Sequence, residues 1–203
     1  MTLEEQIKKL FDIGITLNEG VTIDHLLSFC PRQRYEDEPF DLIMVIYGFE
    51  IDEEPWGRYM CDQVWHFDCE AIYDDGSYTE IVTQFHRITG KAKRIEGLRD
   101  SVDISDSHAT LHYEVDGVKR TLEPVIDDDW ADTQAVATIM EDLCEPGYDF
   151  YPVDNGQGSA WFYLTSGHAM ALNNLANNIF NLNKELPYYH AYPPKKKPWW
   201  KIW

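Results

Sequence analysis

Long apolar runs are missing from this sequence, and so is the start that a secreted protein needs. The longest apolar stretch covers residues 42–47, whereas a helix that crosses a bilayer needs about 20 residues. The N-terminus, MTLEEQIKKLF, places two Glu ahead of its Lys residues, and the apolar run of about 7–15 residues typical of a signal peptide does not follow. We therefore expect a cytoplasmic protein with no transmembrane segment.

Cysteine is scarce, and its spacing indicates neither a metal site nor a redox pair. The four Cys stand at positions 30, 61, 69 and 144, without a CxxC pair. In a reducing cytosol we expect all four to remain thiols. Cys69 lies in an apolar-rich run, where a thiol packs as a small hydrophobic side chain, so we expect it in the core.

The common signatures of catalysis are also missing. The sequence contains neither GxGxxG nor GxxxxGK[ST], and neither GxSxG nor HExxH. His108 and His112 are four residues apart, but their segment has the pattern of a strand, where that spacing is too long for one metal ion. We expect a protein that is not an enzyme and that binds no cofactor and no metal.

Positive charge is scarce. The chain has 17 Lys and Arg against 36 Asp and Glu, for a formal net charge of −19. The last eleven residues, 193–203, hold four Lys and no acid, so residues 1–192 carry 13 basic residues and a net charge of −23. Because each contact to a phosphate backbone needs a cation, this balance excludes direct nucleic-acid binding as the main function. It favours a basic protein as the partner.

What is present is typical of one folded domain. The 203 residues are 44% hydrophobic and 14% aromatic, enough to bury a core without disulfides. We predict a single α+β domain over residues 1–192 and a separate tail, residues 193–203, that is rich in Lys and Trp. We expect this tail to fold back on the acidic domain rather than to anchor in a membrane, since its prolines interrupt an amphipathic helix.

Apolar residues at helical spacing, preceded by capping residues, predict five helices. Thr2 with Glu5, and Ser77 with Glu80, are candidate capping boxes. The predicted helices cover 3–13, 22–30 (capped by Thr22 or Asp24), 77–89, 133–143 and 168–182, the last capped by Ser166. Residues 31–38 are polar and predict a loop. Residues 41–49 fit a buried strand or a core helix, and the flanking Pro39 and Gly48 favour the helix.

Alternating patterns and turn residues predict the strands. Residues 64–72 would place Trp65, Phe67 and Cys69 on a buried face, with Asp68 and Glu70 on the opposite face. The remaining strands form two hairpins: 108–114 with 119–126 around Asp116-Gly117, and 148–153 with 160–164. Hairpins pair antiparallel, so we predict an α+β fold whose mainly antiparallel sheet is flanked by helices.

Two acidic groups are candidate sites. Asp68 and Glu70 share one strand face, where two carboxylates could act as an acid–base pair or hold Mg²⁺, or could simply be solvated. The second group is Asp127, Asp128, Asp129 and Asp132 around Trp130. It lacks the central Gly of a calcium loop.

Two roles are open for the second group, and both can hold. Asp129 or Asp132 can cap the helix that follows. Asp127 and Asp128 beside Trp130 form a negative patch with an aromatic neighbour, which suits a cationic protein surface. We therefore take Asp68, Glu70, Asp127, Asp128 and Trp130 as the candidate partner-binding residues.

Four segments together resemble a group of small bacterial immunity proteins found beside polymorphic toxins. The segments are VWHFDCEAI, GSYTEIVTQFHRITG, DDDWADTQ and GQGSAWFYLT. The resemblance spans residues 40–175 and implies a non-enzymatic inhibitor that blocks a cognate toxin by direct binding. The alternative is a small metal-dependent hydrolase built on the clustered carboxylates. Carboxylates that converge in a cleft around an ion favour the hydrolase, and carboxylates spread over a convex or shallow face favour the binder.

Overall fold

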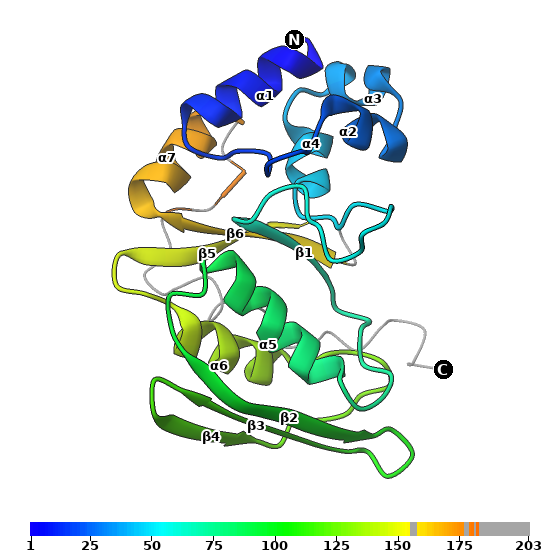
Figure 1. Cartoon of the computed structure of the whole chain (residues 1–203), viewed down its shortest axis with the longest axis vertical. Helices are drawn as coiled ribbons and strands as arrows, with labels where there is room; N and C mark the ends of the chain where they lie inside the picture. The colour runs from blue at the N-terminus through cyan, green and yellow to red at the C-terminus, as the bar shows by residue number, and fades with distance from the viewer. Residues whose placement is uncertain (155–157, 177–178, 181, 183–203) are drawn as a thin grey trace.

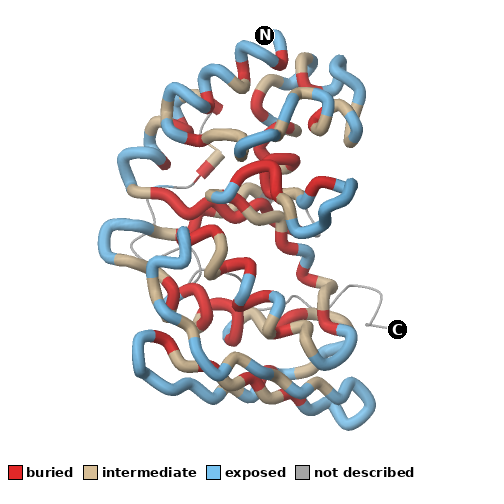
Figure 2. The backbone as a smooth tube through the Cα atoms, in the orientation of Figure 1, coloured by how far each residue is buried: buried red, intermediate tan, exposed pale blue. Residues whose placement is uncertain are grey.

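Helices and antiparallel sheets alternate as four layers in the computed structural model (Figure 1). The structure describes residues 1–154, 158–176, 179, 180 and 182. Within them, seven helices and two three-stranded antiparallel sheets give the α+β fold that the hairpin signals predict. Buried residues concentrate where the layers meet (Figure 2). None of the helices in the described ranges is long and apolar enough to cross a membrane.

The first layer consists of short helices on one face of the first sheet (Figure 1). Its members are α1 (Leu3–Asp12), α2 (Ile23–Phe29), α3 (Arg32–Asp37), α4 (Asp41–Ile46) and α7 (Ser166–Leu175). The Thr2–Glu5 capping box is confirmed, because the Glu5 backbone N–H donates to Thr2 Oγ1 at 3.2 Å and the Thr2 N–H donates to Glu5 Oε2 at 2.9 Å. The helix that we favoured for 41–49 is confirmed as α4.

Two expectations in this layer are wrong. The predicted loop at 31–38 is the helix α3, which forms because Tyr35 is fully buried and its hydroxyl donates to the carbonyl of Leu26 at 2.5 Å. The last helix is capped by Thr165, not Ser166, and ends at Leu175. The predicted tail, residues 193–203, lies outside the described residues.

The first sheet has the strand order β1-β6-β5, and every neighbouring pair is antiparallel. Its strands are β1 (Val64–Asp68), β5 (Tyr148–Asp154) and β6 (Gly158–Thr165). The central strand β6 has helices on both of its faces, so nearly all its residues are buried. The hairpin predicted for 148–153 and 160–164 is confirmed.

The strand predicted for 64–72 is shorter than expected. β1 ends at Asp68, which pairs with Gly158, the first residue of its partner β6. Phe67 and Cys69 are buried as predicted, but Trp65 is only half-buried. Glu70 therefore lies beyond the end of β1.

The second helical layer, α5 (Ser77–Ile88) and α6 (Thr133–Leu143), lies between the two sheets. The bounds of α6 match the prediction, and its N-cap is Asp132, whose Oδ1 accepts the Gln134 N–H at 2.8 Å. The capping box expected at Ser77 is wrong, because α5 begins after Gly76 and the Ser77 hydroxyl accepts N–H groups of the preceding loop instead.

The second sheet covers the other side of α5 and α6, in the order β2-β3-β4. Its strands are β2 (Ile95–Asp103), β3 (His108–Val115) and β4 (Val118–Leu122). The hairpin of β3 and β4 is confirmed, and both turn residues have positive φ, 49° at Asp116 and 86° at Gly117. The sequence did not predict β2, whose apolar residues do not alternate because the register shifts between Glu96 and Arg99.

Candidate functional site

The two acidic groups predicted separately from the sequence lie side by side in the structure. The chain beyond β1 pairs antiparallel with the segment that precedes α6. The Ile72 N–H donates to the Asp129 carbonyl at 2.9 Å, and the Ala131 N–H donates to the Cys69 carbonyl at 2.8 Å. Glu70 and Trp130 form a bridge between these two hydrogen bonds. Backbone pairing of residues 69–72 with 129–131 thus joins the two acidic segments into one surface.

We call this the acidic surface. It comprises Asp68, Glu70, Tyr73, Asp74, Val125, Asp127, Asp128 and Trp130. All five candidate residues from the sequence belong to it. Sequence reasoning missed Tyr73, Asp74 and Val125, because their exposure depends on how the two segments pair.

Apolar side chains stand among these carboxylates. The side chains of Tyr73 and Val125 are 64% and 69% exposed, and Trp130 is half-buried. Asp68, Asp127 and Asp128 are exposed. Exposed aromatic and apolar side chains are enriched where another protein binds, and polar groups form the rim of such interfaces.

The acidic segment before α6 is held in place by its own turn. The Trp130 N–H donates to the Asp127 carbonyl at 3.3 Å, and Asp128 adopts a φ of 60°, which Asp tolerates better than most residues. Asp132 is used for structure: Oδ2 accepts the Val125 N–H at 2.7 Å while Oδ1 caps α6. Of the two roles left open for this group, Asp132 therefore takes the cap, and Asp127 and Asp128 stay at the surface.

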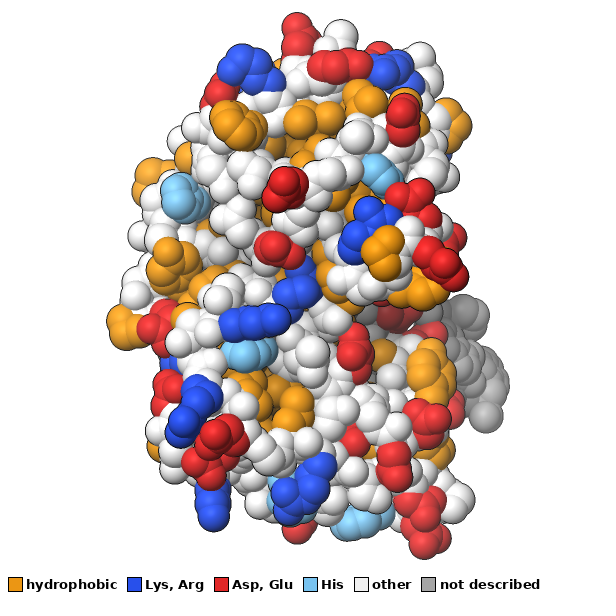
Figure 3. All heavy atoms as spheres, viewed as in Figure 1, with side chains coloured by type: hydrophobic (Ala, Val, Ile, Leu, Met, Phe, Trp, Pro, Cys, Tyr) orange, Lys and Arg blue, Asp and Glu red, His pale blue; other side chains and the backbone are white. Residues whose placement is uncertain are grey.

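Positive charge is absent from the sequence around this surface. Residues 59–86 and 121–154 contain no Lys or Arg. In Figure 3, carboxylates line the right-hand edge of the lower half of the molecule, and Lys and Arg gather toward its left and centre. None of the ion pairs in the described ranges involves Asp68, Asp74 or Asp128.

A groove runs beside the acidic surface, between the edge strand β1 and the first turn of α5. Its volume is about 420 Å³. Half-buried Trp65 and Ala71 supply its apolar lining, with the buried Phe67 and Ile81 behind them, and Asp68, Asp74 and Glu80 supply carboxylates. His66 also lines the groove, and burial lowers the pKa of its imidazole below the ordinary value. The imidazole is therefore biased toward its neutral form.

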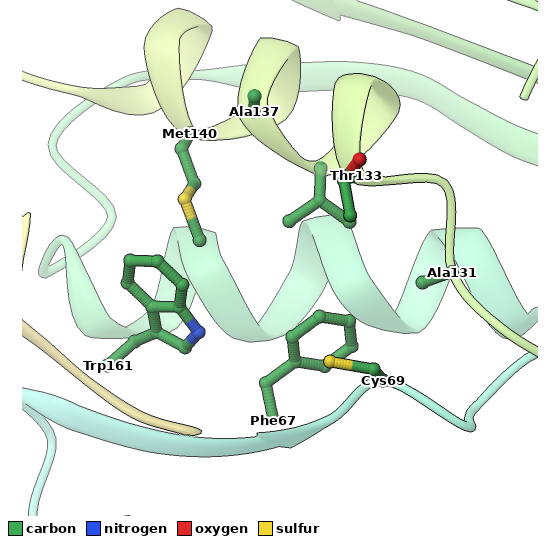
Figure 4. Close-up of a pocket in the computed structure, with 8 residues that line it drawn as sticks. Phe67, Cys69, Ala131, Thr133, Ala137, Met140 and Trp161 are labelled. Atoms are coloured by element: carbon green, nitrogen blue, oxygen red, sulfur yellow. The ribbon is translucent and has the colours of Figure 1, made fainter. Parts of the chain in front are cut away.

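A second, apolar cavity lies beneath the acidic surface. Figure 4 shows Phe67 and Cys69 facing α6, with Met140 and Trp161 closing one end. The volume is about 10 Å³, which is close to the minimum for one water molecule. This space is a packing defect of the core and too small for a cofactor or a substrate.

The carboxylates do not converge as a metal centre would require. Among the residues that the structure describes, no three of His, Cys, Asp and Glu form a group that could hold a metal ion. Asp68 Oδ1 accepts the Glu70 backbone N–H at 3.0 Å, so this pair is arranged by a local turn.

The cysteines remain free thiols, as expected. Burial raises the pKa of Cys61 to about 12 and that of Cys144 to about 11. Both groups are therefore protonated at neutral pH, which makes them poor nucleophiles. Cys69 is buried in the core, as the sequence predicts.

In comparisons with known proteins, no family model, no curated protein and no solved structure matches this chain.

Proposed function

We propose that this protein is a non-enzymatic binding module that neutralises a basic toxin by covering part of its surface. The contact is made by the acidic surface. The observation that carries the proposal is the pairing of residues 69–72 with 129–131, which joins two acidic segments that also carry exposed Tyr73 and Val125. The resemblance of four sequence segments to immunity proteins supports the same reading.

Electrostatics explains why such a surface suits a cationic protein. A net charge of −19 attracts a basic partner over several ångströms and can raise the association rate by about 10–1000-fold. The carboxylates also oppose association with acidic proteins. The exposed aromatic and apolar side chains then supply contact area once the partner is bound.

The first experiment identifies the partner. The full chain and a variant carrying Asp127→Asn and Asp128→Asn are used to capture proteins from the native host, and the proteins enriched by the unchanged chain are sequenced. We expect a basic protein that inhibits growth when produced alone and is tolerated when produced with this chain. A partner that is acidic, or that is not toxic, would contradict the proposal.

The second experiment measures kinetics with the purified partner. The Asp127→Asn, Asp128→Asn variant should associate more slowly, and its rate should depend less on salt, because rim charges act mainly on the association rate. The control variant carries Glu19→Gln and Glu141→Gln, two exposed carboxylates outside the acidic surface. This control has the same net charge as the Asp127→Asn, Asp128→Asn variant, but it should associate as fast as the unchanged chain. If the two variants associate at equal rates, the acidic surface is not part of the interface.

A further inference from the structure

The groove between β1 and α5 differs in shape from the acidic surface beside it, because it is a hollow of about 420 Å³ that can enclose part of a ligand. Trp65 lies against Phe67 and Phe85, with ring centroids 5.0 and 4.9 Å apart, so this wall is fixed by the core. Asp68, Asp74 and Glu80 are exposed along it. The groove could hold on the order of ten water molecules, and thus a long side chain.

Backbone donors at the start of α5 are already used within the fold. Asp100, on β2, accepts the backbone N–H groups of Gly76, Tyr78 and Thr79 at 2.7, 2.8 and 3.0 Å. A helix N-terminus normally attracts an anion, but here the carboxylate of Asp100 occupies that position. An anionic ligand therefore has little to bind at the start of α5.

Three more backbone N–H groups of the loop before α5 are used in the same way. The Ser77 hydroxyl accepts the N–H groups of Tyr73 and Asp74 at 3.1 and 3.3 Å, and the Ser77 N–H donates to the Asp74 carbonyl at 3.2 Å. What this loop offers to a ligand is carboxylate oxygen. Such a groove is complementary to a group that is cationic, rich in donors and carried on an apolar stem.

We infer that the groove receives an Arg or Lys side chain of the protein partner. The aliphatic stem lies against Trp65 and Ala71, and the cationic head is bound by Asp68, Asp74 and Glu80. Arg and Lys combine an apolar stem with a charged end, which matches this lining. The inference rests on the proposed function, and it assigns to the groove the anchor residue of an interface whose rim is formed by the remaining acidic surface.

The test uses a defined probe, the acetylated and amidated pentapeptide Ala-Leu-Arg-Leu-Ala, followed by NMR on the full ¹⁵N-labelled chain. We expect shifts at the backbone amides along the groove and at the Trp65 indole. The same peptide with citrulline in place of Arg keeps the shape but loses the charge, and it should bind at least about fivefold more weakly. Equal binding of the two peptides would overturn the inference.

Two variants test separately whether peptide binding needs the charges of the groove and its open volume. Asp74→Asn with Glu80→Gln removes two charges, and Ala71→Met fills the groove while leaving the charges in place. Each should weaken binding of the Arg peptide by about fivefold or more. The Glu19→Gln, Glu141→Gln variant should bind it as the unchanged chain does. Thermal melts of all variants verify that the fold is retained. Unchanged binding by both groove variants would overturn the inference.

The inference can fail while the proposed function stands. If both groove variants keep the affinity for the native partner and Asp127→Asn with Asp128→Asn still slows association, the groove is not the anchor site. If none of these variants affects the partner, both proposals are wrong. Changing Lys195, Lys196 and Lys197 together to Gln should leave peptide binding unchanged. Tighter binding by that variant would assign the groove to the chain's own C-terminal residues and overturn the inference.

Discussion

Asp100 shows how a single carboxylate can couple two layers of the fold. It lies on β2, and its carboxylate accepts three backbone N–H groups at the start of α5. We expect Asp100→Ala to lower the free energy of unfolding by about 0.5–2 kcal/mol, toward the upper end because three donors lose their acceptor. Urea denaturation measures the change.

The matched control for this prediction is Asp106→Ala. Asp106 is exposed in the turn between β2 and β3, and removing its side chain removes the same charge without uncapping a helix. Its effect should stay within about 0.5 kcal/mol. Equal losses in the two variants would show that Asp100 does not act as the cap.

Because of His66, we expect the free energy of unfolding to depend on pH. Burial lowers the pKa of its imidazole, and the ring also packs edge-on against Phe49 with centroids 4.6 Å apart. The unfolded chain therefore binds a proton near pH 6.5 while the folded chain does not, so stability falls as the pH drops from about 6.5 toward the folded pKa. His66→Gln should flatten this part of the curve of unfolding free energy against pH.

The exposed histidine His108 provides the control for that measurement. Replacing it by Gln should leave the slope below pH 6.5 as it is in the unchanged chain. If His66→Gln retains the full slope, the dependence arises from other groups. Both curves should be recorded above about pH 5, where carboxylates add little to the titration.

Residue roles were predictable where the partners are close in sequence. The Asp132 cap and the Thr2–Glu5 capping box involve residues within three positions of each other, so the sequence pattern contains both partners. The Asp100 cap joins residues more than 20 positions apart, and Ser77 appears in the sequence to be the better candidate. A local sequence pattern cannot identify a capping residue that comes from a distant part of the chain.

Helices and strands were likewise predictable where a local pattern encodes them, and not where distant contacts determine them. The hairpin at Asp116-Gly117 is encoded by its turn, and α6 by its regular apolar spacing. The strand β2 has no such signal, because a register shift breaks its alternation and its pairing with β3 determines it. The end of β1 at Asp68 likewise reflects where β6 begins rather than any change in its own sequence.

Gly48 determines how closely α4 approaches β1. A Cβ at this position would overlap the backbone nitrogen of His66, whose N–H donates to the Gly48 carbonyl at 2.9 Å. The obstacle is backbone and cannot rotate away. We expect Gly48→Ala to lower the free energy of unfolding by about 1–3 kcal/mol, measured by chemical denaturation.

Gly167 is the control for Gly48. It lies in the first turn of α7, where an added Cβ would meet only the Thr165 hydroxyl, at 3.9 Å. Gly167→Ala should be neutral or should raise stability by up to about 1 kcal/mol, since Ala favours a helix and restricts the unfolded chain. A similar cost at both positions would contradict the close approach at Gly48.

At the scale of the molecule, the sequence identified part of the candidate site but not how its two segments meet. The acidic groups Asp68 with Glu70, and Asp127 with Asp128, were recognised from their spacing in the sequence. The two groups come together because Ile72 pairs with Asp129 and Glu70 forms a bridge with Trp130. The groove depends further on the packing of α5 against β1. Such long-range contacts carry no signal in a single sequence.

The final prediction concerns the net charge of −19. Like charges crowd the acidic surface, and most ion pairs in the described ranges have an exposed partner and contribute little to stability. Repulsion should therefore outweigh attraction at low salt, where the screening length is about 30 Å, and fade near 0.15 M, where it is about 8 Å. We expect the Tm of the unchanged chain to rise when NaCl increases from 10 to 150 mM.

Variants at the acidic surface test the origin of this rise. Asp127→Asn with Asp128→Asn should raise the Tm at 10 mM NaCl and have little effect at 150 mM, because it removes the repulsion that salt also screens. Asp132→Ala should lower the Tm at both salt concentrations, since it removes the α6 cap. A Tm that falls with added salt, or an Asp127→Asn, Asp128→Asn variant that melts earlier at 10 mM, would mean that these carboxylates stabilise the fold rather than strain it.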